Sequence, residues 1–176
     1  MYLYPRGEDF SDVQVFEEYN EPRGVALQRW KWGTQGLDMQ NPYWISYRNL
    51  YGNKKDRYMM NAYLSYDILD WLNITGRVRI DHSSSDYERK NYAGTIELFA
   101  GEKGFYSLEK INDKQAYADF MINIDKQFGT DFSLSANIGT SYADKYNDVA
   151  GAQGDLKDMS NLFNYHNINM KDGRAS

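Results

Sequence analysis

The clearest pattern in the chain is a regular alternation of apolar and polar residues between positions 56 and 82. Two alternating stretches flank the segment Asp67-Ile68-Leu69-Asp70, which has the composition of a turn. Because successive side chains of a strand point to opposite faces, each stretch predicts a β-strand with one apolar and one polar face. The register that keeps the apolar residues of this hairpin on one side places Leu64 opposite Ile74.

The same alternation predicts a second hairpin between positions 115 and 142. Its turn is Gly129-Thr130-Asp131, and its register places Ile124 opposite Ala136. The other segments lack this period and are rich in Gly, Asn, Asp and Lys, which predicts loops. The predicted organisation is a loop over 1–55, a hairpin over 56–82, a loop over 83–114, a hairpin over 115–142 and a loop over 143–176.

The strand length and the loop lengths favour a membrane location. Each predicted strand has about ten residues, the length that crosses a bilayer at a tilt of ~45°. Short turns alternate with loops of roughly thirty residues, which compact soluble domains seldom contain. The predicted fold class is all-β, an antiparallel transmembrane β-barrel segment of at least four strands in an incomplete barrel.

Aromatic side chains lie near both ends of the predicted strands, as in the girdles of outer-membrane barrels. The candidate lipid-interface residues are Tyr58, Tyr66, Trp71, Phe128, Phe132 and Tyr142. The polar strand faces predict a polar lumen, and its candidate residues are Asn61, Arg77, Arg79, Asp81 and Asp119. A pairing of the second and third strands with Arg77 near Met121 places Arg79 opposite Asp119, where opposite charges stabilise the pair.

A soluble β-sandwich produces a similar alternation, with its apolar faces packed inward. A secreted carbohydrate-binding β-sandwich module is therefore the alternative interpretation. The negative mean hydropathy of −0.77 does not decide between the two, because only every second residue of a transmembrane strand meets lipid. The net charge of −5 and the absence of a Lys/Arg cluster argue against a nucleic-acid partner.

Short motifs occur along most of the chain in an order that resembles a known family. They are Tyr4-Pro5 with Asp9-Phe10, Asn41-Pro42-Tyr43-Trp44, Arg48-Asn49, Asp56-Arg57, Tyr66-Asp67, Asp70-Trp71-Leu72, Gly76-Arg77 followed by Asp81, and Gly94-Thr95 with Tyr106-Ser107. In these residues and their spacing the chain resembles the β-barrel of SusC/RagA-like TonB-linked (TonB-dependent) outer-membrane transporters of Bacteroidetes bacteria.

The resemblance implies a barrel of about 22 strands. It also implies a plug domain inside that barrel, a SusD-like lipoprotein lid and import of glycans or peptides with energy relayed by TonB. Such transporters are several times longer than this chain. We therefore expect a piece of the barrel, without the plug, the TonB-contacting segment or a signal peptide, that does not transport alone. The expected surroundings are outer-membrane lipid.

Aromatic residues of segment 1–55 are candidates for ligand contact, because aromatic faces suit sugar rings and peptide side chains. These candidates are Trp30, Trp32, Tyr43 and Trp44. The alternative is that the tryptophans pack the loop against itself, since exposed aromatics indicate binding only when they cluster in space.

Catalytic and metal-binding patterns are weak. His82 is followed by Ser83-Ser84-Ser85-Asp86, but catalytic triads assemble from residues that converge in space. The chain has no cysteine and two histidines without metal-site spacing. The aspartates of the predicted loop 144–158 are calcium-ligand candidates, namely Asp144, Asp148, Asp155 and Asp158. They lack the residue order of an EF-hand, so a solvated acidic loop is the default interpretation. We therefore expect no enzyme activity and no cofactor.

Overall fold

The computed structural model describes residues 7, 9–31 and 40–170. The chain divides into two compact units, each built from separate parts of the sequence. The first, here called the terminal unit, comprises Met1–Lys54, Asp86–Lys110 and Val149–Ser176. The second, here called the hairpin unit, comprises Lys55–Ser85 and Ile111–Asp148.

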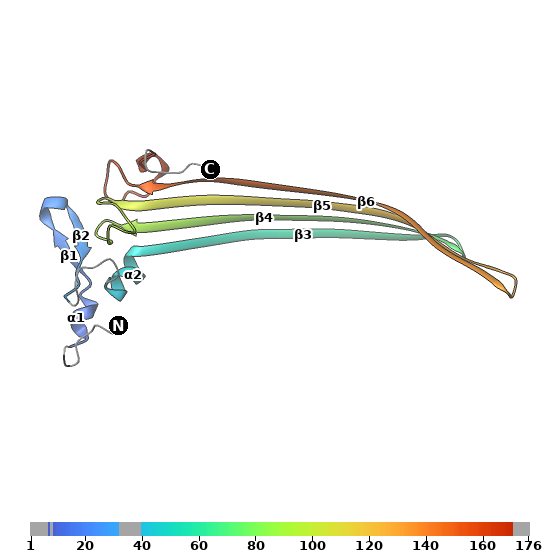
Figure 1. Ribbon diagram of the computed structural model, residues 1–176, viewed down its shortest axis with the longest axis horizontal. Helices are drawn as coiled ribbons and strands as arrows, with labels where there is room; N and C mark the ends of the chain where they lie inside the picture. The colour runs from blue at the N-terminus through green and yellow to red at the C-terminus, as the bar shows by residue number, and fades with distance from the viewer. Residues whose placement is uncertain (1–6, 8, 32–39, 171–176) are drawn as a thin grey trace. The chain divides into compact units, whose positions relative to one another are not determined.

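Four long strands form one antiparallel sheet in the order β3-β4-β5-β6, so each strand pairs with the next along the chain (Figure 1). The strands are β3 (Asn49–Leu69), β4 (Leu72–Tyr92), β5 (Gly104–Phe128) and β6 (Phe132–Asp155). The expected all-β class is confirmed, and the predicted hairpins are β3-β4 and β5-β6.

The strands have 21 to 25 residues and are about twice as long as predicted. The segment 83–114, predicted as a loop, contains the end of β4 and the start of β5, and only 93–103 connect them. Likewise, β3 begins within the predicted loop 1–55, and β6 continues to Asp155 within the predicted loop 143–176. The reason is that apolar and polar residues do not alternate regularly in these parts, and strand pairing depends on backbone hydrogen bonds that hydropathy does not report.

The two hairpin turns are short. Asp70-Trp71 alone connects β3 to β4, a tighter turn than the predicted four-residue segment. Gly129-Thr130-Asp131 connects β5 to β6 as predicted, and Gly129 adopts a positive φ of 69° that suits a residue without Cβ.

Contacts between side chains agree with the register predicted within each hairpin. Arg57 contacts Asp81 across β3 and β4, two positions that are opposite when Leu64 faces Ile74. Asn147 donates to Asp113 across β6 and β5, as expected when Ile124 faces Ala136. Both hairpins therefore have the predicted register, which places their apolar residues on one face of the sheet.

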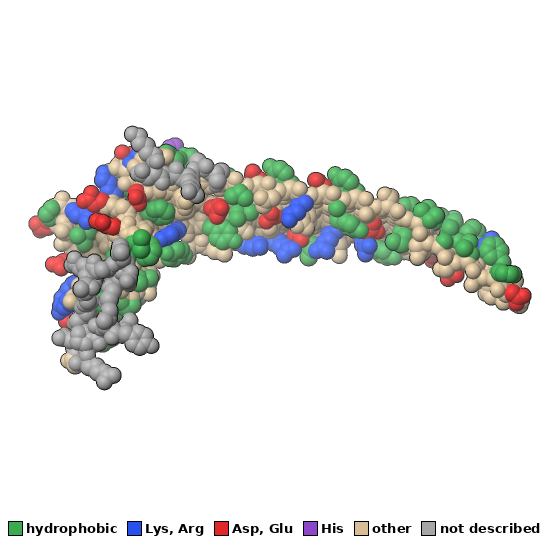
Figure 2. All heavy atoms as spheres, in the orientation of Figure 1, with side chains coloured by type: hydrophobic (Ala, Val, Ile, Leu, Met, Phe, Trp, Pro, Cys, Tyr) green, Lys and Arg blue, Asp and Glu red, His purple; other side chains and the backbone are tan. Residues whose placement is uncertain are grey.

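The residues of the hairpin unit form strands and turns alone, so its part of the sheet is a single layer. Its apolar face is open: Leu64 is 72% exposed, Ile138 63% and Phe132 74%. Figure 2 shows hydrophobic side chains exposed along these strands, and they are dense near the turns that close the hairpins. An exposed apolar surface of this extent indicates a site that another apolar phase or molecule covers.

The terminal unit begins with α1 (Ser11–Gln14) and an antiparallel pair of short strands, β1 (Glu17–Asn20) and β2 (Val25–Gln28). The one-turn helix η1 (Glu21–Arg23) connects them. A second helix, α2 (Pro42–Arg48), leads into β3, and η2 (Tyr165–Asn167) lies near the end of the chain. None of the helices in the described ranges is long and apolar enough to cross a membrane.

Asn41 and Trp44 join α2 to its neighbours. The Asn41 side chain accepts a hydrogen bond from the Tyr43 N–H as the helix cap and donates to the carbonyls of Val13 and Arg29. Trp44 is fully buried, and its Nε1–H donates to Thr95 Oγ1 at 3.0 Å. The motif Asn41-Pro42-Tyr43-Trp44 therefore has a structural role, because it connects α2 to the segments that contain Val13, Arg29 and Thr95.

The connection 93–103 between β4 and β5 is held by partners from three segments of the terminal unit. Its Thr95 meets Trp44, and the Ala93 N–H donates to Asn161 Oδ1 at 2.7 Å. Gly94 has φ 97°, and a Cβ there would come within 2.9 Å of Leu27 Cα in β2. A small apolar cluster of Tyr106, Ala152, Leu156 and Ile168 with Phe163 packs the C-terminal segment onto β5 and β6.

We expect Trp44→Ala to destabilise the terminal unit by about 3–5 kcal/mol, because a large buried side chain and its hydrogen bond to Thr95 are lost. Amide hydrogen exchange should then accelerate in 41–49 and 93–100. Ile45→Ala is the matched control, since Ile45 lies on the same helix and is 43% exposed. Unchanged exchange in Trp44→Ala would contradict the structural role of this residue.

Candidate functional site

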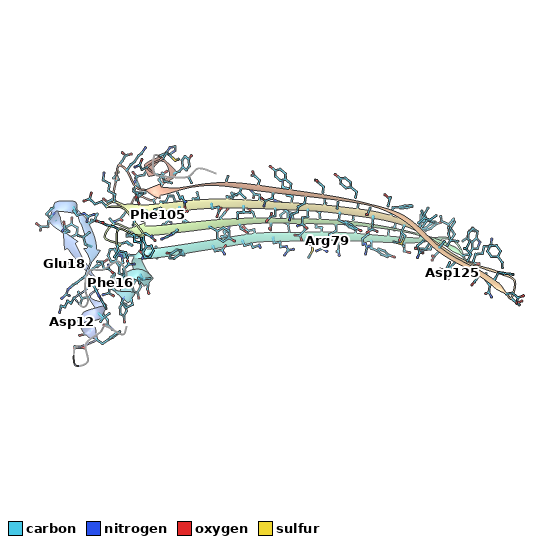
Figure 3. The ribbon with its side chains drawn as sticks, viewed as in Figure 1. Asp12, Phe16, Glu18, Arg79, Phe105 and Asp125 are labelled. Atoms are coloured by element: carbon cyan, nitrogen blue, oxygen red, sulfur yellow. The ribbon has the colours of Figure 1, made fainter. Side chains whose placement is uncertain are left out.

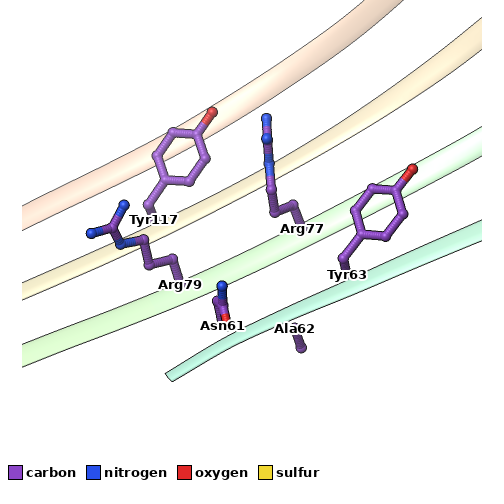
Figure 4. Close-up of a pocket in the computed structure, with 6 residues that line it drawn as sticks. All are labelled: Asn61, Ala62, Tyr63, Arg77, Arg79 and Tyr117. Carbon is purple, nitrogen blue, oxygen red and sulfur yellow. The ribbon is translucent and has the colours of Figure 1, made fainter. Parts of the chain in front are cut away.

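A shallow pocket of about 510 Å³ lies on the polar face of the sheet in the hairpin unit (Figure 4). Its lining residues come from β3, β4 and β5 and are Asn61, Ala62, Tyr63, Arg77, Arg79 and Tyr117. A second depression of about 360 Å³ shares Arg79 and Tyr117 and adds Asp81 and Gln115. We call these two depressions, which share Arg79 and Tyr117, the arginine pocket.

Asp81, which lines the smaller depression, forms an ion pair with two hydrogen bonds to Arg57 across β4 and β3. Arg57 Nε donates to Asp81 Oδ1 at 2.9 Å, and its Nη2 donates to Oδ2 at 2.6 Å. The Asp81 side chain is only 12% exposed, whereas that of Arg57 is 53% exposed. The arginine thus covers the carboxylate in the fork geometry that makes such pairs specific.

A second ion pair connects β4 to β5. Arg77 Nε donates to Asp119 Oδ2 at 2.7 Å, and the carboxylate is again shielded, with 10% of its side chain exposed. The prediction that Arg79 lies opposite Asp119 is wrong by two residues. Since a shift of two positions preserves the face of every side chain, both arginines still project from the predicted polar face.

Arg79 has weaker partners than the other two arginines. Its Nη2 contacts Met59 Sδ at 3.0 Å and lies 3.9 Å from Asp81 Oδ2, an oxygen that already accepts from Arg57. Three guanidinium groups therefore share two carboxylates on this face. The arginine pocket has an excess of positive charge, centred on Arg79.

Amide and hydroxyl groups continue the polar face toward the turns. Asn73 Nδ2 donates to Ser65 Oγ and to Asp67 Oδ1, and Asn123 Nδ2 donates to Asn73 Oδ1 at 3.0 Å. The row crosses three strands and is connected by side-chain hydrogen bonds throughout. The face thus offers fixed polar groups that are suited to polar ligands or to water.

The structure brings the predicted lumen residues together on one face. Asn61, Arg77 and Arg79 line the larger depression, Asp81 lines the smaller one, and Asp119 binds Arg77. Figure 3 shows side chains leaving both sides of the strands, with Arg79 on β4 and Asp125 on β5 labelled. That this face borders a lumen remains a prediction.

The predicted interface aromatics are mostly exposed on the hairpin unit. Tyr66, Phe128 and Phe132 lie beside the turns, and Tyr58 and Tyr142 lie farther along the strands, each at least half exposed. Trp71 in the first turn is partly buried, and Lys126 Nζ lies 4.2 Å from the centre of its ring and 5.3 Å from that of Phe128. Lys126 therefore lies within the range of cation–π contact of two aromatic rings beside the turns.

The predicted ligand-contact aromatics do not form one surface. Trp44 is fully buried and bound to Thr95, so no face of its ring is open to a ligand, which corrects the prediction for this residue. Trp30 is partly buried, and Trp32 lies outside the described residues. The alternative interpretation, packing of the segment against itself, holds for Trp44.

Tyr43 belongs to an aromatic cluster that sequence reasoning missed. Its ring lies near those of Phe10, Phe16 and Tyr47, with 5.4 Å between the ring centres of Phe16 and Tyr47. Arg48 lies over Phe16 and binds Glu17 through two hydrogen bonds. The spacing of Tyr43 and Tyr47 by four residues is the sequence signal for one helical face, but it is visible only once α2 is recognised.

The aspartates proposed for a calcium loop do not converge. Asp144, Asp148 and Asp155 belong to β6, and Asp155 Oδ1 accepts from the Gly101 N–H at 2.7 Å. Across the described ranges, no group of three or more His, Asp or Glu residues has metal-site geometry. The 144–158 segment is therefore a strand with a short extension.

Comparison with known proteins does not assign the chain to a family. No protein-family model matches the chain, and no curated protein matches it either.

A hydrogen-bonded pair of the buried Tyr106 and the partly exposed Glu88 connects β5 to β4 in the terminal unit. Tyr106 donates its hydroxyl to Glu88 Oε1 at 2.8 Å, and Lys90 binds the other oxygen of the same carboxylate. Burial, together with the Glu88 hydrogen bond, raises the pKa of Tyr106 to about 12. The fold therefore favours the neutral phenol.

We expect the stabilisation from this pair to be complete below the unfolded tyrosine pKa of about 10 and to be lost as pH rises through about 12. The difference in alkaline ultraviolet absorbance between the parent chain and Tyr106→Phe should titrate near the upper value. Glu88→Gln should lower that midpoint, whereas Glu109→Gln, a change at an exposed position on the strand of Tyr106, should not. A Tyr106 midpoint near 10 would refute the assignment.

The observed pairing of β4 with β5 can be tested by crosslinking, because the chain contains no cysteine. We expect Arg77→Cys with Asp119→Cys to crosslink with a short bis-thiol reagent faster than Arg79→Cys with Asp119→Cys. The reason is that directly opposite positions are closer than diagonal ones. Faster reaction of the second pair would restore the register predicted from sequence.

Proposed function

We propose that the hairpin unit is a transmembrane segment of an outer-membrane β-barrel, in a TonB-dependent importer of the SusC/RagA type. The observation that carries the proposal is a single-layer sheet with an open apolar face on one side and a fixed polar face on the other. Lipid covers an apolar face of this kind in a barrel wall, and water or cargo meets the polar face. Such a wall has no catalytic role.

The edges of the sheet support membership of a larger barrel. β3 and β6 each pair on one side only within the described residues, and both are longer than 20 residues. Long unpaired edges invite aggregation unless further strands cover them. In a barrel, neighbouring strands on either side complete the hydrogen bonding.

The extent of the strands also fits the proposal. About ten residues of each strand are needed to cross the bilayer, and the alternation of the hairpin unit supplies them. The terminal unit contains the parts of β3 to β6 that lack the regular apolar–polar alternation, and its connection 93–103 and C-terminal segment are packed. We assign the terminal unit to the outer, aqueous side, where long strands and loops capture ligands.

The importer class rests on the resemblance of the motifs to SusC/RagA-like transporters. In that class the outer loops and a SusD-like lipoprotein capture an oligosaccharide or peptide, and TonB drives its passage beside a plug. Affinity isolation of the tagged protein from outer membranes tests this part. We expect a SusD-like lipoprotein to co-purify, and its absence would leave a barrel of another class.

The secreted β-sandwich remains the second candidate, with soluble carbohydrate binding as its function. A sandwich requires a second layer over the apolar face. The hairpin unit contains strands and turns of one layer only, and this single layer favours the barrel segment.

Paired nitroxide labels test the membrane location. In the chain reconstituted into bilayers, we expect labels at Leu64→Cys and Ile138→Cys to be accessible to oxygen and shielded from a water-soluble nickel complex. Labels at the adjacent polar-face positions, Ser65→Cys and Asn137→Cys, should show the reverse, because neighbouring strand residues face opposite sides. These neighbours are matched controls for depth along the strand.

Two results would contradict the proposal. One is equal accessibility of both labels in each pair. The other is a chain that stays in the aqueous phase with Leu64 and Ile138 shielded from both reagents, as the sandwich requires.

A further inference from the structure

We propose that the arginine pocket is a binding subsite for the carboxylate of an acidic sugar, such as a uronic acid unit of an oligosaccharide. This inference deepens the proposed function, on which it rests for its biological role, by naming a substrate class. The chemistry itself depends only on the polar face of the hairpin unit.

The charge of the arginine pocket favours an anion. Arg57 and Arg77 each bind one aspartate closely, whereas Arg79 is 3.9 Å from an oxygen that Arg57 already occupies. An added carboxylate can accept two parallel hydrogen bonds from one guanidinium, the geometry that Arg57 already forms with Asp81. Arg79 is therefore the primary ligand of the proposed anion.

Access to the arginine pocket is open. The side chains of Arg77 and Arg79 are 56% and 53% exposed, so a ligand does not have to displace a packed group. Their backbones are nonetheless fixed, because β4 is an inner strand that pairs with β3 and β5. Fixed donors on a paired strand lose less entropy on binding than donors on a loop.

The uncharged lining favours a sugar over a simple anion. Figure 4 shows Arg77 between Tyr63 and Tyr117, with Arg79 on the same strand β4 and Asn61 on the adjacent strand β3. Phenol rings offer apolar faces and hydroxyl groups, and the Asn61 amide can donate to and accept from sugar hydroxyls. A ring that bears both a carboxylate and hydroxyls uses all of these groups, whereas an acidic peptide has few hydroxyls for the amide and the phenols.

Calorimetry on the full chain in detergent tests this subsite with trigalacturonate as the probe. We expect binding that weakens as salt is raised, because screening shortens from ~10 Å at 0.1 M to ~3 Å at 1 M ionic strength. Neutral galactotriose should bind more weakly, and triglutamate should bind more weakly than trigalacturonate. Absence of trigalacturonate binding would overturn the proposal without affecting the membrane location, which the nitroxide labels report.

Variants identify the residues that bind. Arg79→Gln should weaken trigalacturonate by about tenfold or more, since a hydrogen bond to a charged group is worth more than a neutral one. Arg79→Lys should lose less, because the charge is retained without the fork. Lys114→Gln is the matched control, as it removes one positive charge from an exposed β5 position outside the pocket lining.

A gain of affinity separates binding from failure to fold. Asp119→Asn releases Arg77 from its carboxylate and should tighten trigalacturonate binding severalfold, an effect that a damaged fold cannot produce. Unchanged or weaker binding in Asp119→Asn, unchanged binding in Arg79→Gln, or triglutamate binding equal to that of trigalacturonate would each contradict an acidic-sugar subsite.

Discussion

Every side chain of the hairpin unit is assigned to one of two faces by the period of two of a β-strand, and no second layer of this unit covers either face. The apolar face then needs a partner that is not part of the unit, and the charged side chains of the polar face must pair with one another. The proposed function follows from the first need, and the arginine pocket from the second. A single layer of strands has no second layer with which to form a globular core, which is why we propose that it belongs to a barrel wall.

Charge pairing gives the polar face its order. Arg57 with Asp81 fastens β3 to β4, and Arg77 with Asp119 fastens β4 to β5, so the two pairs cross the sheet in succession. Because the arginine side chain of each pair is more than half exposed to solvent, these pairs contribute more to register than to stability. The third arginine, Arg79, shares an aspartate, and this shared partner distinguishes a binding surface from a fully paired ladder.

The period of two made the hairpins, their faces and the register within each of them predictable from the sequence. The register between the two hairpins was harder to predict from the sequence, because a shift by two residues leaves each side chain on the same face. Arg79 was therefore predicted opposite Asp119, where the structure has Arg77. The ends of the strands were missed where apolar and polar residues do not alternate regularly, as in 83–92. Trp44 was misjudged because burial depends on Thr95, a residue 51 positions away in the chain.

The central claim, that lipid covers the apolar face of the hairpin unit, is tested most directly by magnetisation transfer from lipid acyl chains to the protein in bilayer nanodiscs. Transfer is expected to the methyl groups of Leu64, Leu134 and Ile138, while the rings of Tyr63 and Tyr117 should receive magnetisation from water. Methyl groups that receive magnetisation from water, or only from other side chains, would contradict the account.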